Sequence, residues 1–390
     1  MDYPHKPVPD PSLATARPST NGRLGARVPA TALGLCSIFV WLAACAAPEA
    51  PVYPDKRDLL HYLDRQGRPH PIEGRTHWDI RRIHTLQNMQ KVMGPLPRLP
   101  DDPLEVQVLE TESLPQVERR KITFVSQVVE GKPDRVPAYL LIPDGLPERE
   151  TSPAVLCLHQ TTAIGKAEPA GLGGKTDLHY ALELARRGYV TLAPDYPGFG
   201  DYKIDPYAMG YASATMKAIL NHRRAIDLLQ SLPVVDPNSI GVIGHSLGGH
   251  NALFLSAFEP RVAAVATSCG FNAFRHYYGG DLKGWSHRGY MPRIARLYGS
   301  DAARMPFDFT EVLGILAPRP VFISAPEGDH NFAVAGVREC MEAALPVYQR
   351  LFHSPDRLVA RHPKVGHEFP DAVRREAYEF FDRWLSGEYE

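Results

Sequence analysis

The hydrophobic pattern of the second half of the chain predicts strands and helices in alternation. After Pro153, short and wholly apolar runs alternate with amphipathic segments. A strand covered on both faces reads as a continuous apolar run, and alternation with helices is typical of a parallel sheet. The runs that predict strands are residues 154–158, 189–193, 240–243, 262–267, 321–324 and 358–360. The segments that predict helices are residues 178–187, 214–232, 247–258, 334–352 and 372–385.

The region before Pro153 follows other patterns. Residues 104–142 alternate between polar and apolar side chains, which predicts antiparallel strands at the edge of the sheet. Apolar residues recur at helical spacing from Trp78 to Met93, and Gly94-Pro95 ends that helix. Residues 46–75 show neither pattern and are typical of an extended linker. We therefore expect a linker and N-terminal helical segment over residues 46–103 and one catalytic α/β domain over residues 104–390.

The first 45 residues predict an export signal. Arg23 and Arg27 precede an uncharged apolar stretch, residues 28–44, which is shorter than the ~20 residues of a spanning helix. It ends in Leu42-Ala43-Ala44-Cys45, which resembles the bacterial lipoprotein box, in which the cysteine is lipidated. We expect an exported protein that Cys45 anchors to a membrane, facing the periplasm or on the outer membrane or cell surface. A plain secretory signal and a buried apolar segment are the alternatives.

Composition and charge set limits on the partners. Hydrophobic residues make up 44% of the chain, which is ordinary for a globular protein. The chain has 43 Lys and Arg against 44 Asp and Glu, and its formal net charge is -1. A nucleic-acid partner normally requires a basic face, so we expect no nucleic-acid binding.

One motif predicts a catalytic serine. Gly244-His245-Ser246-Leu247-Gly248 lies between an apolar run and a helical segment, and it has the G-x-S-x-G form of a nucleophile elbow. In such an elbow the serine takes a strained backbone conformation that lifts its hydroxyl off the sheet. Glycine two residues to either side avoids collision with the neighbouring backbone. We expect Ser246 to be the nucleophile; a structural turn without catalysis is the alternative.

A serine nucleophile requires a base and an orienting acid, which follow it in this chain order. Asp329 lies in the loop after the run that ends at Ser324, and His367 lies in a loop before the last helix. We expect Asp329 to be the acid and His367 the base, with Glu327 as the alternative acid. His362 is interpreted as structural.

A tetrahedral intermediate requires N–H donors aimed at its oxygen. We expect these to be the backbone groups of Leu247 and Gln160, with Thr161 as the alternative to Gln160. His159 either braces this loop or simply ends its strand. His250 follows Ser246 by one helical turn and is expected to face away from an incoming substrate.

These residues resemble a known family. His159-Gln160, Asp195-Tyr-Pro-Gly-Phe-Gly, Gly-His-Ser246-Leu-Gly-Gly, Asp329 and Gly-His367-Glu-Phe are similar to the dienelactone hydrolase and acetyl-xylan-esterase-like branch of the α/β-hydrolases. The resemblance runs from about Lys121 to Leu385. It implies a mostly parallel eight-stranded sheet with helices on both faces and no cofactor. Dienelactone hydrolases proper have a cysteine nucleophile, so their substrate is not expected here.

Residues 270–310 have the character of an insertion that caps the site. Phe271, Tyr277 and Trp285 are candidates to contact a sugar or aryl ring, with packing of the cap as the alternative role. The chain has no H-E-x-x-H motif and no G-x-G-x-x-G that opens a helix after a strand, so we expect no metal and no nucleotide.

The sequence therefore predicts a serine carboxylic-ester hydrolase that works through an acyl-enzyme. The expected substrates are polysaccharide esters or small aryl and acyl esters. A serine peptidase of the prolyl-oligopeptidase type and a non-catalytic surface protein of the same fold are the alternatives.

Overall fold

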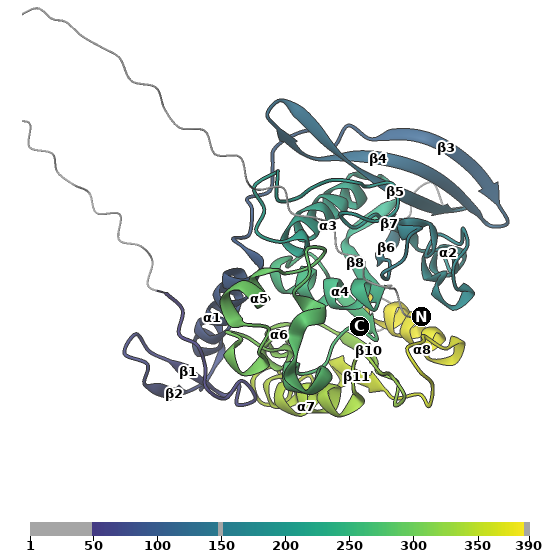
Figure 1. Cartoon of the computed structure of the whole chain (residues 1–390). Helices are drawn as coiled ribbons and strands as arrows, with labels where there is room; N and C mark the ends of the chain where they lie inside the picture. Colours follow the sequence, from purple (N-terminus) through teal and green to yellow (C-terminus); the bar gives the residue numbers. More distant parts are fainter. Residues whose placement is uncertain (1–48, 147–150, 386–390) are drawn as a thin grey trace, which may run out of the picture. The chain divides into compact units, whose positions relative to one another are not determined.

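The computed structural model describes residues 49–146 and 151–385, and a nine-stranded mixed sheet runs through the larger part of them (Figure 1). The strand order is β11-β10-β9-β8-β6-β7-β5-β4-β3. The strands are β3 (Gln107–Leu114), β4 (Val117–Val129), β5 (Lys132–Pro143), β6 (Ser152–Leu158), β7 (Val190–Pro194), β8 (Val235–His245), β9 (Ala264–Ser268), β10 (Val321–Ser324) and β11 (Leu358–Arg361).

The two expected parts of the sheet are both present. The strands from β11 to β7 pair in parallel, whereas β5, β4 and β3 join them in antiparallel order. The expected number of eight strands is wrong, because β3 adds a ninth at the edge. Seven of its eight residues are exposed, and it lies within residues 104–142, where antiparallel edge strands were expected; the number eight came from the family resemblance.

Helices cover both faces of the sheet, as expected. Alternate residues of β6 enter two separate cores: Leu156 packs into one and Val155 into the other, because successive side chains of a strand point to opposite faces. The first core includes α3 (Ala214–Ser231), α4 (Leu247–Phe258), α6 (Phe309–Ile315) and α7 (Val334–Pro346). The second core includes α2 (Tyr180–Arg186) and α8 (Asp371–Leu385).

The N-terminal segment is part of the same compact unit as the sheet. Residues 49–103 form a short hairpin, β1 (His61–Leu63) with β2 (Pro69–Pro71), and the helix α1 (Arg75–Met93). The expected linker is thus partly structured, and the physical reason is burial of Tyr53 and Leu59. Arg81 of α1 makes a buried ion pair with Glu311 of α6 at 2.9 Å, which fastens the helix to the domain.

The segment between β9 and α6 packs against α4, where the ring centroid of Trp285 lies 4.7 Å from that of His250. It consists of short 3-10 turns and one helix, α5 (Arg293–Tyr298). Its aromatic side chains pack together, with Phe274 at 5.8 Å from Trp285 and 5.3 Å from Phe309 between ring centroids. The segment corresponds to the expected insertion at residues 270–310, although α6, which follows it, was not predicted.

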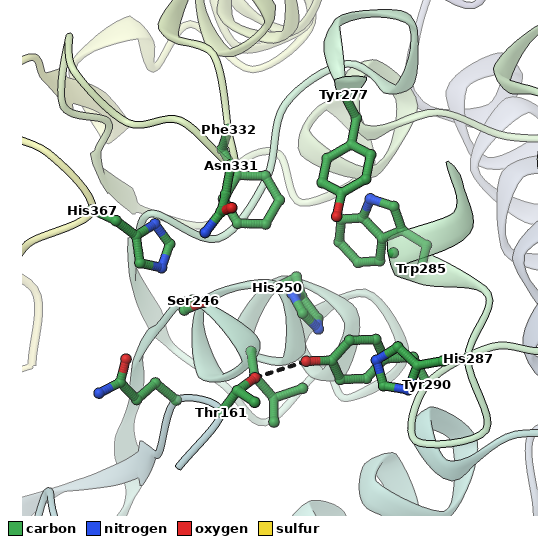
Figure 2. Close-up of a pocket in the computed structure, with 13 residues that line it drawn as sticks. Thr161, Ser246, His250, Tyr277, Trp285, His287, Tyr290, Asn331, Phe332 and His367 are labelled. Carbon is green, nitrogen blue, oxygen red and sulfur yellow. Dashed lines mark hydrogen bonds between the residues drawn. The ribbon is translucent and has the colours of Figure 1, made fainter. Parts of the chain in front are cut away.

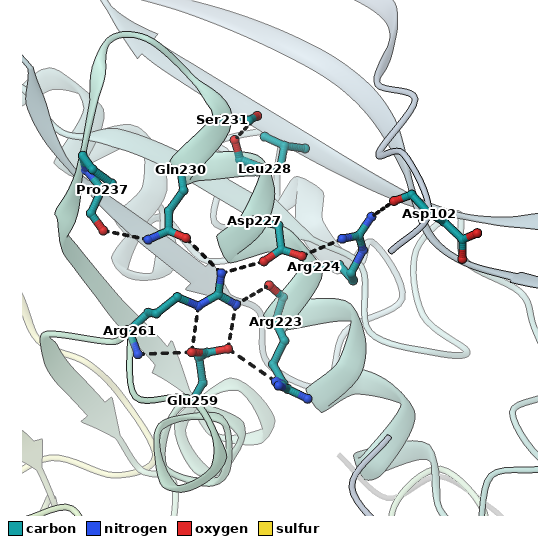
Figure 3. Close-up of polar contacts among 10 residues, drawn as sticks. All are labelled: Asp102, Arg223, Arg224, Asp227, Leu228, Gln230, Ser231, Pro237, Glu259 and Arg261. Atoms are coloured by element: carbon teal, nitrogen blue, oxygen red, sulfur yellow. Dashed lines mark hydrogen bonds and ion pairs between the residues drawn. The ribbon is translucent and has the colours of Figure 1, made fainter. Parts of the chain in front are cut away.

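A polar network fixes the end of α3 to the turn after α4 (Figure 3). Arg261 donates to Glu259 at 2.7 and 2.9 Å and to Asp227 at 2.6 Å. Glu259 is buried; burial raises its pKa, but the hydrogen bonds and charge of Arg261 outweigh that effect and lower the pKa below its usual value. The network therefore holds in place the helix that carries the nucleophile elbow.

Residues 1–48 lie outside the described part of the chain, so the predicted signal segment and Cys45 are not described. Within residues 49–146 and 151–385, no helix has the length and apolar character needed to cross a membrane.

Candidate active site

Ser246 stands in the strained turn that the motif predicts. It lies between β8 and α4 with φ 53° and ψ -114°, a backbone conformation that residues other than glycine rarely adopt. A Cβ on Gly244 would lie 2.2 Å from the Gly248 oxygen, and one on Gly248 would lie 1.8 Å from the Leu158 oxygen. Glycine is therefore required at both positions, and the serine side chain stands at the N-terminus of α4.

His367 and Asp329 are paired in the loops after β11 and β10. The Nδ1 group of His367 donates to both carboxylate oxygens of Asp329, each at 3.0 Å. Burial raises the pKa of Asp329, but the hydrogen bond and charge of His367 outweigh it, and the pKa falls below its usual value. Asp329 is therefore an ionised acceptor that fixes the ring and leaves Nε2 free to act as a base.

Glu327, the alternative acid, lies elsewhere. Its carboxylate is exposed and receives a hydrogen bond from Arg338 at 3.3 Å. His362, interpreted as structural, bonds the main-chain oxygen of Ala325 at 2.9 Å. Of the expected acids, only Asp329 contacts His367 in the described part of the chain.

One cavity of about 440 Å³ brings Ser246 and His367 together. Figure 2 shows the His367 imidazole directed toward the Ser246 side chain across this cavity. Three segments far apart in the sequence therefore meet at one edge of the sheet: the elbow, the loop of Asp329 and the loop of His367. This is the arrangement that a serine nucleophile with a general base requires.

The expected oxyanion loop borders the same cavity. Leu247, Gln160 and Thr161 are among the residues that line it. Leu247 is the first residue of α4, where a backbone N–H has no acceptor within the helix. The N–H groups of this loop and of Leu247 are therefore candidates to bind a developing oxyanion.

His159 holds the oxyanion loop in place. Its Nδ1 donates to the Gln160 oxygen at 2.6 Å, and its Nε2 accepts from the Tyr196 N–H at 2.9 Å. Burial lowers the pKa of His159, which keeps the neutral form that both bonds require. Because this bond fixes the Gln160 carbonyl, it also fixes the N–H of Thr161 in the same peptide unit. The bracing role considered for His159 is the one the geometry supports.

The cap closes the cavity on the side opposite His367. Tyr277, Trp285 and Tyr290 line the cavity. The hydroxyl of Tyr290 also forms a 2.7 Å hydrogen bond with the hydroxyl of Thr161 (Figure 2). Phe271 does not line the cavity: it is 2% exposed and packs on Phe309 at 5.3 Å. The expectation that Phe271 meets substrate is therefore corrected to a packing role.

Several residues of the cavity were not identified from the sequence. Asn331 and Phe332 lie two and three residues after Asp329, and that proximity was a usable signal. Tyr290 was among the aromatic residues of the expected cap, whereas His287 had no mark of its own. His250, expected to face away from substrate, lines the cavity instead, because the cap covers the first turn of α4. This expectation was wrong.

Among the described residues, one group has the geometry to hold a metal ion: Cys269, Asp329 and His367, whose ligand atoms lie within 4.8 Å of one another. Burial raises the pKa of the Cys269 thiol, which disfavours the thiolate that a metal needs. Asp329 and His367 are already bonded to each other. The donor set fits an acid–base pair better than a metal centre, and the expectation of no metal remains a prediction.

His245 packs against His367, the expected base. Its ring is fully buried and lies edge-on to His367 at 4.9 Å between centroids. Burial, with a contribution from His367, lowers the pKa of His245 well below its usual value. The neighbour of the base therefore stays neutral and does not repel a proton on His367.

Comparison with known proteins gives a consistent picture. A family model described as glucuronyl esterase of fungi matches residues 207–352. The hydrolase YtaP of Bacillus subtilis is 25% identical over 272 residues, which cover 65% of this chain and 84% of that protein. The 4-O-methyl-glucuronoyl methylesterase 1 of Wolfiporia cocos is 29% identical over 196 residues, 45% of this chain and 47% of the fungal enzyme. That match spans about half the length of the fungal enzyme.

Solved structures share the fold. A glucuronoyl esterase from Solibacter usitatus superposes with a TM-score of 0.67 at 19% identity, over 86% of this chain and 99% of that one. A structure from Bacteroides fragilis described as an acetyl xylan esterase gives a TM-score of 0.55 at 17% identity, over 79% and 83%. At these identities the likeness shows the fold, and it confirms the α/β-hydrolase fold class. The chain therefore has the α/β-hydrolase fold, and parts of it are similar to ester hydrolases.

Proposed function

We propose that this protein is a serine carboxylic-ester hydrolase that cleaves esters of carbohydrates, with Ser246, His367 and Asp329 as its catalytic residues. The observation that carries the proposal is that the strained serine and the Asp329-bound imidazole border one cavity. The fixed Nδ1 bond leaves Nε2 of His367 as the nitrogen that faces the serine hydroxyl.

The geometry supports a two-stage reaction. The Ser246 hydroxyl attacks the ester carbonyl while His367 Nε2 takes its proton, and the backbone N–H groups of Leu247 and the Gln160–Thr161 loop bind the oxyanion. The imidazolium then protonates the leaving alcohol, and an acyl-enzyme remains. Water, deprotonated by His367, attacks the acyl-enzyme and releases the acid.

Two observations support a carbohydrate ester as the substrate. The cavity is lined by aromatic rings, including Trp285 and Tyr290, which suit the face of a sugar ring. The names of matching proteins specify glucuronoyl esters, and one neighbour from Sporotrichum thermophile was solved with methyl 4-O-methyl-β-D-glucopyranuronate. We propose sugar uronate esters as the first substrates to examine.

The test is an ester panel on residues 46–390, with Ser246→Ala as the matched inactive variant. The panel contains 4-nitrophenyl acetate, benzyl D-glucuronate, an acetylated xylo-oligosaccharide and a peptide nitroanilide. We expect turnover of at least one ester, loss of that turnover in Ser246→Ala and no cleavage of the amide. Cleavage of the peptide alone would favour the peptidase alternative, and a wild type inert on every ester would contradict the proposal.

We further propose that Cys45 is lipidated and that the protein is exported and membrane-anchored. The support is the Leu42-Ala43-Ala44-Cys45 motif after an apolar stretch. In a bacterial host, mass spectrometry of the full chain should detect a diacylglyceryl-modified N-terminal cysteine. A Cys45→Ser variant should move from the membrane fraction to the soluble fraction, and unchanged membrane attachment would contradict the anchor.

A further inference from the structure

The side chain of Asn331 borders the catalytic cavity and has no role in the reaction described above. It lines the same cavity as Ser246 and His367, and Figure 2 shows its amide directed into that cavity, on the side opposite Thr161. Its main-chain N–H donates at 2.8 Å to Oδ1 of Asp329, the carboxylate that holds His367. The backbone from which the amide projects is therefore fixed beside the acid–base pair.

One hydrogen bond determines which end of this amide is free. The hydroxyl of Tyr278, in the cap, donates to Oδ1 of Asn331 at 3.0 Å, so the amide oxygen is bonded. The Nδ2 group has no hydrogen-bond partner within residues 49–146 and 151–385. Asn331 is partly exposed and its Nδ2 is not one of the buried atoms that lack a partner, so a molecule in the cavity can reach it. The amide therefore offers N–H donors to a substrate.

Several neighbouring side-chain groups of the cavity are already bonded. The hydroxyls of Thr161 and Tyr290 share a 2.7 Å hydrogen bond, and Nε2 of Gln160 donates to both carboxylate oxygens of Glu168, at 2.9 and 3.1 Å. None of the described residues that line the cavity carries a carboxylate, an ammonium or a guanidinium group. An ionised group would therefore lose its hydration there without an opposite charge to pair with. The cavity suits a neutral oxygen acceptor, such as an ether or a hydroxyl oxygen.

We infer that Asn331 is a specificity-determining residue whose Nδ2 group donates a hydrogen bond to an ether or hydroxyl oxygen of the substrate near the scissile ester. The inference rests on the proposed function and specifies which esters the same cavity selects. Two kinds of carbohydrate ester carry such an oxygen. In a uronate ester it is the ring oxygen, on the carbon next to the carbonyl, and in an acylated sugar it belongs to the alcohol. An ester without this oxygen removes water from the amide and gives it no partner, so it reacts more slowly.

Two pairs of esters of nearly equal shape test this inference. In 4-nitrophenyl methoxyacetate, an oxygen replaces one methylene of the acyl part of 4-nitrophenyl butyrate. In methoxyethyl acetate, an oxygen replaces one methylene of the alcohol part of butyl acetate. For the wild type and Asn331→Leu, kcat/KM is measured for all these esters, and the ratio of the oxygen-bearing ester to its hydrocarbon partner is compared. The intrinsic reactivity of each ester is the same for both proteins and cancels in this comparison.

We expect at least one of the two ratios to fall about tenfold in Asn331→Leu, because a hydrogen bond to the substrate oxygen is lost. A fall in the first pair assigns the acceptor to the acyl part, as in a uronate ester. A fall in the second pair assigns it to the alcohol part, as in an acylated sugar. Unchanged ratios in both pairs would overturn the inference, while turnover of the esters by the wild type would still support the proposed function.

A second variant tests the orientation of the amide. The Tyr278 side chain is 61% exposed, so Tyr278→Phe removes the hydroxyl without disturbing the core. The amide of Asn331 can then turn its oxygen toward the substrate, and we expect the same ratio to fall about threefold. An unchanged ratio in Tyr278→Phe would contradict the fixed donor on which the inference depends.

The chain supplies a matched control for the change from asparagine to leucine. Asn238, at the start of β8, is exposed and does not line the cavity. Its one printed bond in the described structure is made by its main-chain N–H, to Asp236. Asn238→Leu should leave both ratios at their wild-type values, and a fall equal to that in Asn331→Leu would overturn the role of Asn331. A wild type inert on these esters and on benzyl D-glucuronate would overturn the proposed function, and the inference with it.

Discussion

The imidazole of His367 is held by both carboxylate oxygens of Asp329, each 3.0 Å from Nδ1. Asp329 is itself fixed, since its Oδ1 accepts from the N–H groups of Asn331 at 2.8 Å and Phe332 at 3.2 Å. The ring therefore has one orientation, in which Nε2 faces the cavity. In the proposed reaction, the same carboxylate would stabilise the imidazolium form of His367.

Replacing Asp329 by asparagine tests this relationship. The amide keeps the size of the side chain but removes the charge and one acceptor, so we expect kcat to fall by about 10² to 10⁴ with a smaller change in KM. Steady-state kinetics on the best ester of the panel provides the measurement. Glu327→Gln is the control and should retain wild-type kcat, because Glu327 contacts Arg338 and not His367. If the two substitutions were equally harmful, Asp329 would not be the acid.

Much of the fold could be predicted, and Ser246, Asp329 and His367 could be proposed as catalytic residues, because each has a local signature. Residues 240–243 read as a strand because β8 is buried on both faces, and the motif at Ser246 needs its glycines for steric reasons. The edge strand β3 lies within residues 104–142, whose alternation predicted antiparallel strands; the number of eight strands came from the family resemblance and not from this pattern. The position of His250 depends on how the cap crosses α4, and the packing of Phe271 depends on Phe309. Both depend on residues that are distant in the sequence, so the spacing of nearby residues does not predict them.

The His159 bridge predicts an effect on the oxyanion loop. His159→Phe keeps an aromatic ring near Phe199 but loses the bonds to Gln160 and Tyr196. The backbone donors then shift, and we expect kcat to fall about 10- to 100-fold with KM changing less. Stopped-flow acylation rates measure this step. If KM rose while the acylation rate at saturation stayed at the wild-type value, the loop would serve binding alone.

Buried histidines predict loss of stability in acid. Burial lowers the pKa of His222 to about 3, so between pH values of about 6.5 and about 3 the unfolded chain binds a proton that the folded chain does not. Its contribution is complete above about pH 6.5 and is lost as the pH falls. In His222→Phe, the drop in unfolding free energy from about pH 7.5 to about pH 5.5 should be smaller by about 1.4 kcal/mol. Urea unfolding at both pH values measures it, and an identical drop in both proteins would refute the prediction.

The Arg261 network predicts a cost in stability without a direct effect on catalysis. Arg261→Ala leaves the buried carboxylate of Glu259 with the 3.1 Å hydrogen bond from the backbone N–H of residue 261 and the 3.4 Å contact to Arg223, and we expect a loss of about 3 kcal/mol in unfolding free energy. Arg288→Ala is the control. Its exposed pair with Asp205 should contribute less than about 1 kcal/mol. Equal losses in urea unfolding would show that the network does not hold α3 to the turn after α4.

The most direct test of the account is covalent labelling of the nucleophile. The protein is treated with a fluorophosphonate, and the adduct is mapped by peptide mass spectrometry. We expect a single adduct on Ser246 that forms at least about 10³ times more slowly in His367→Ala, because the hydroxyl then lacks its base. Labelling of another residue, or labelling of Ser246 at an equal rate without His367, would contradict the claim that these two side chains act together.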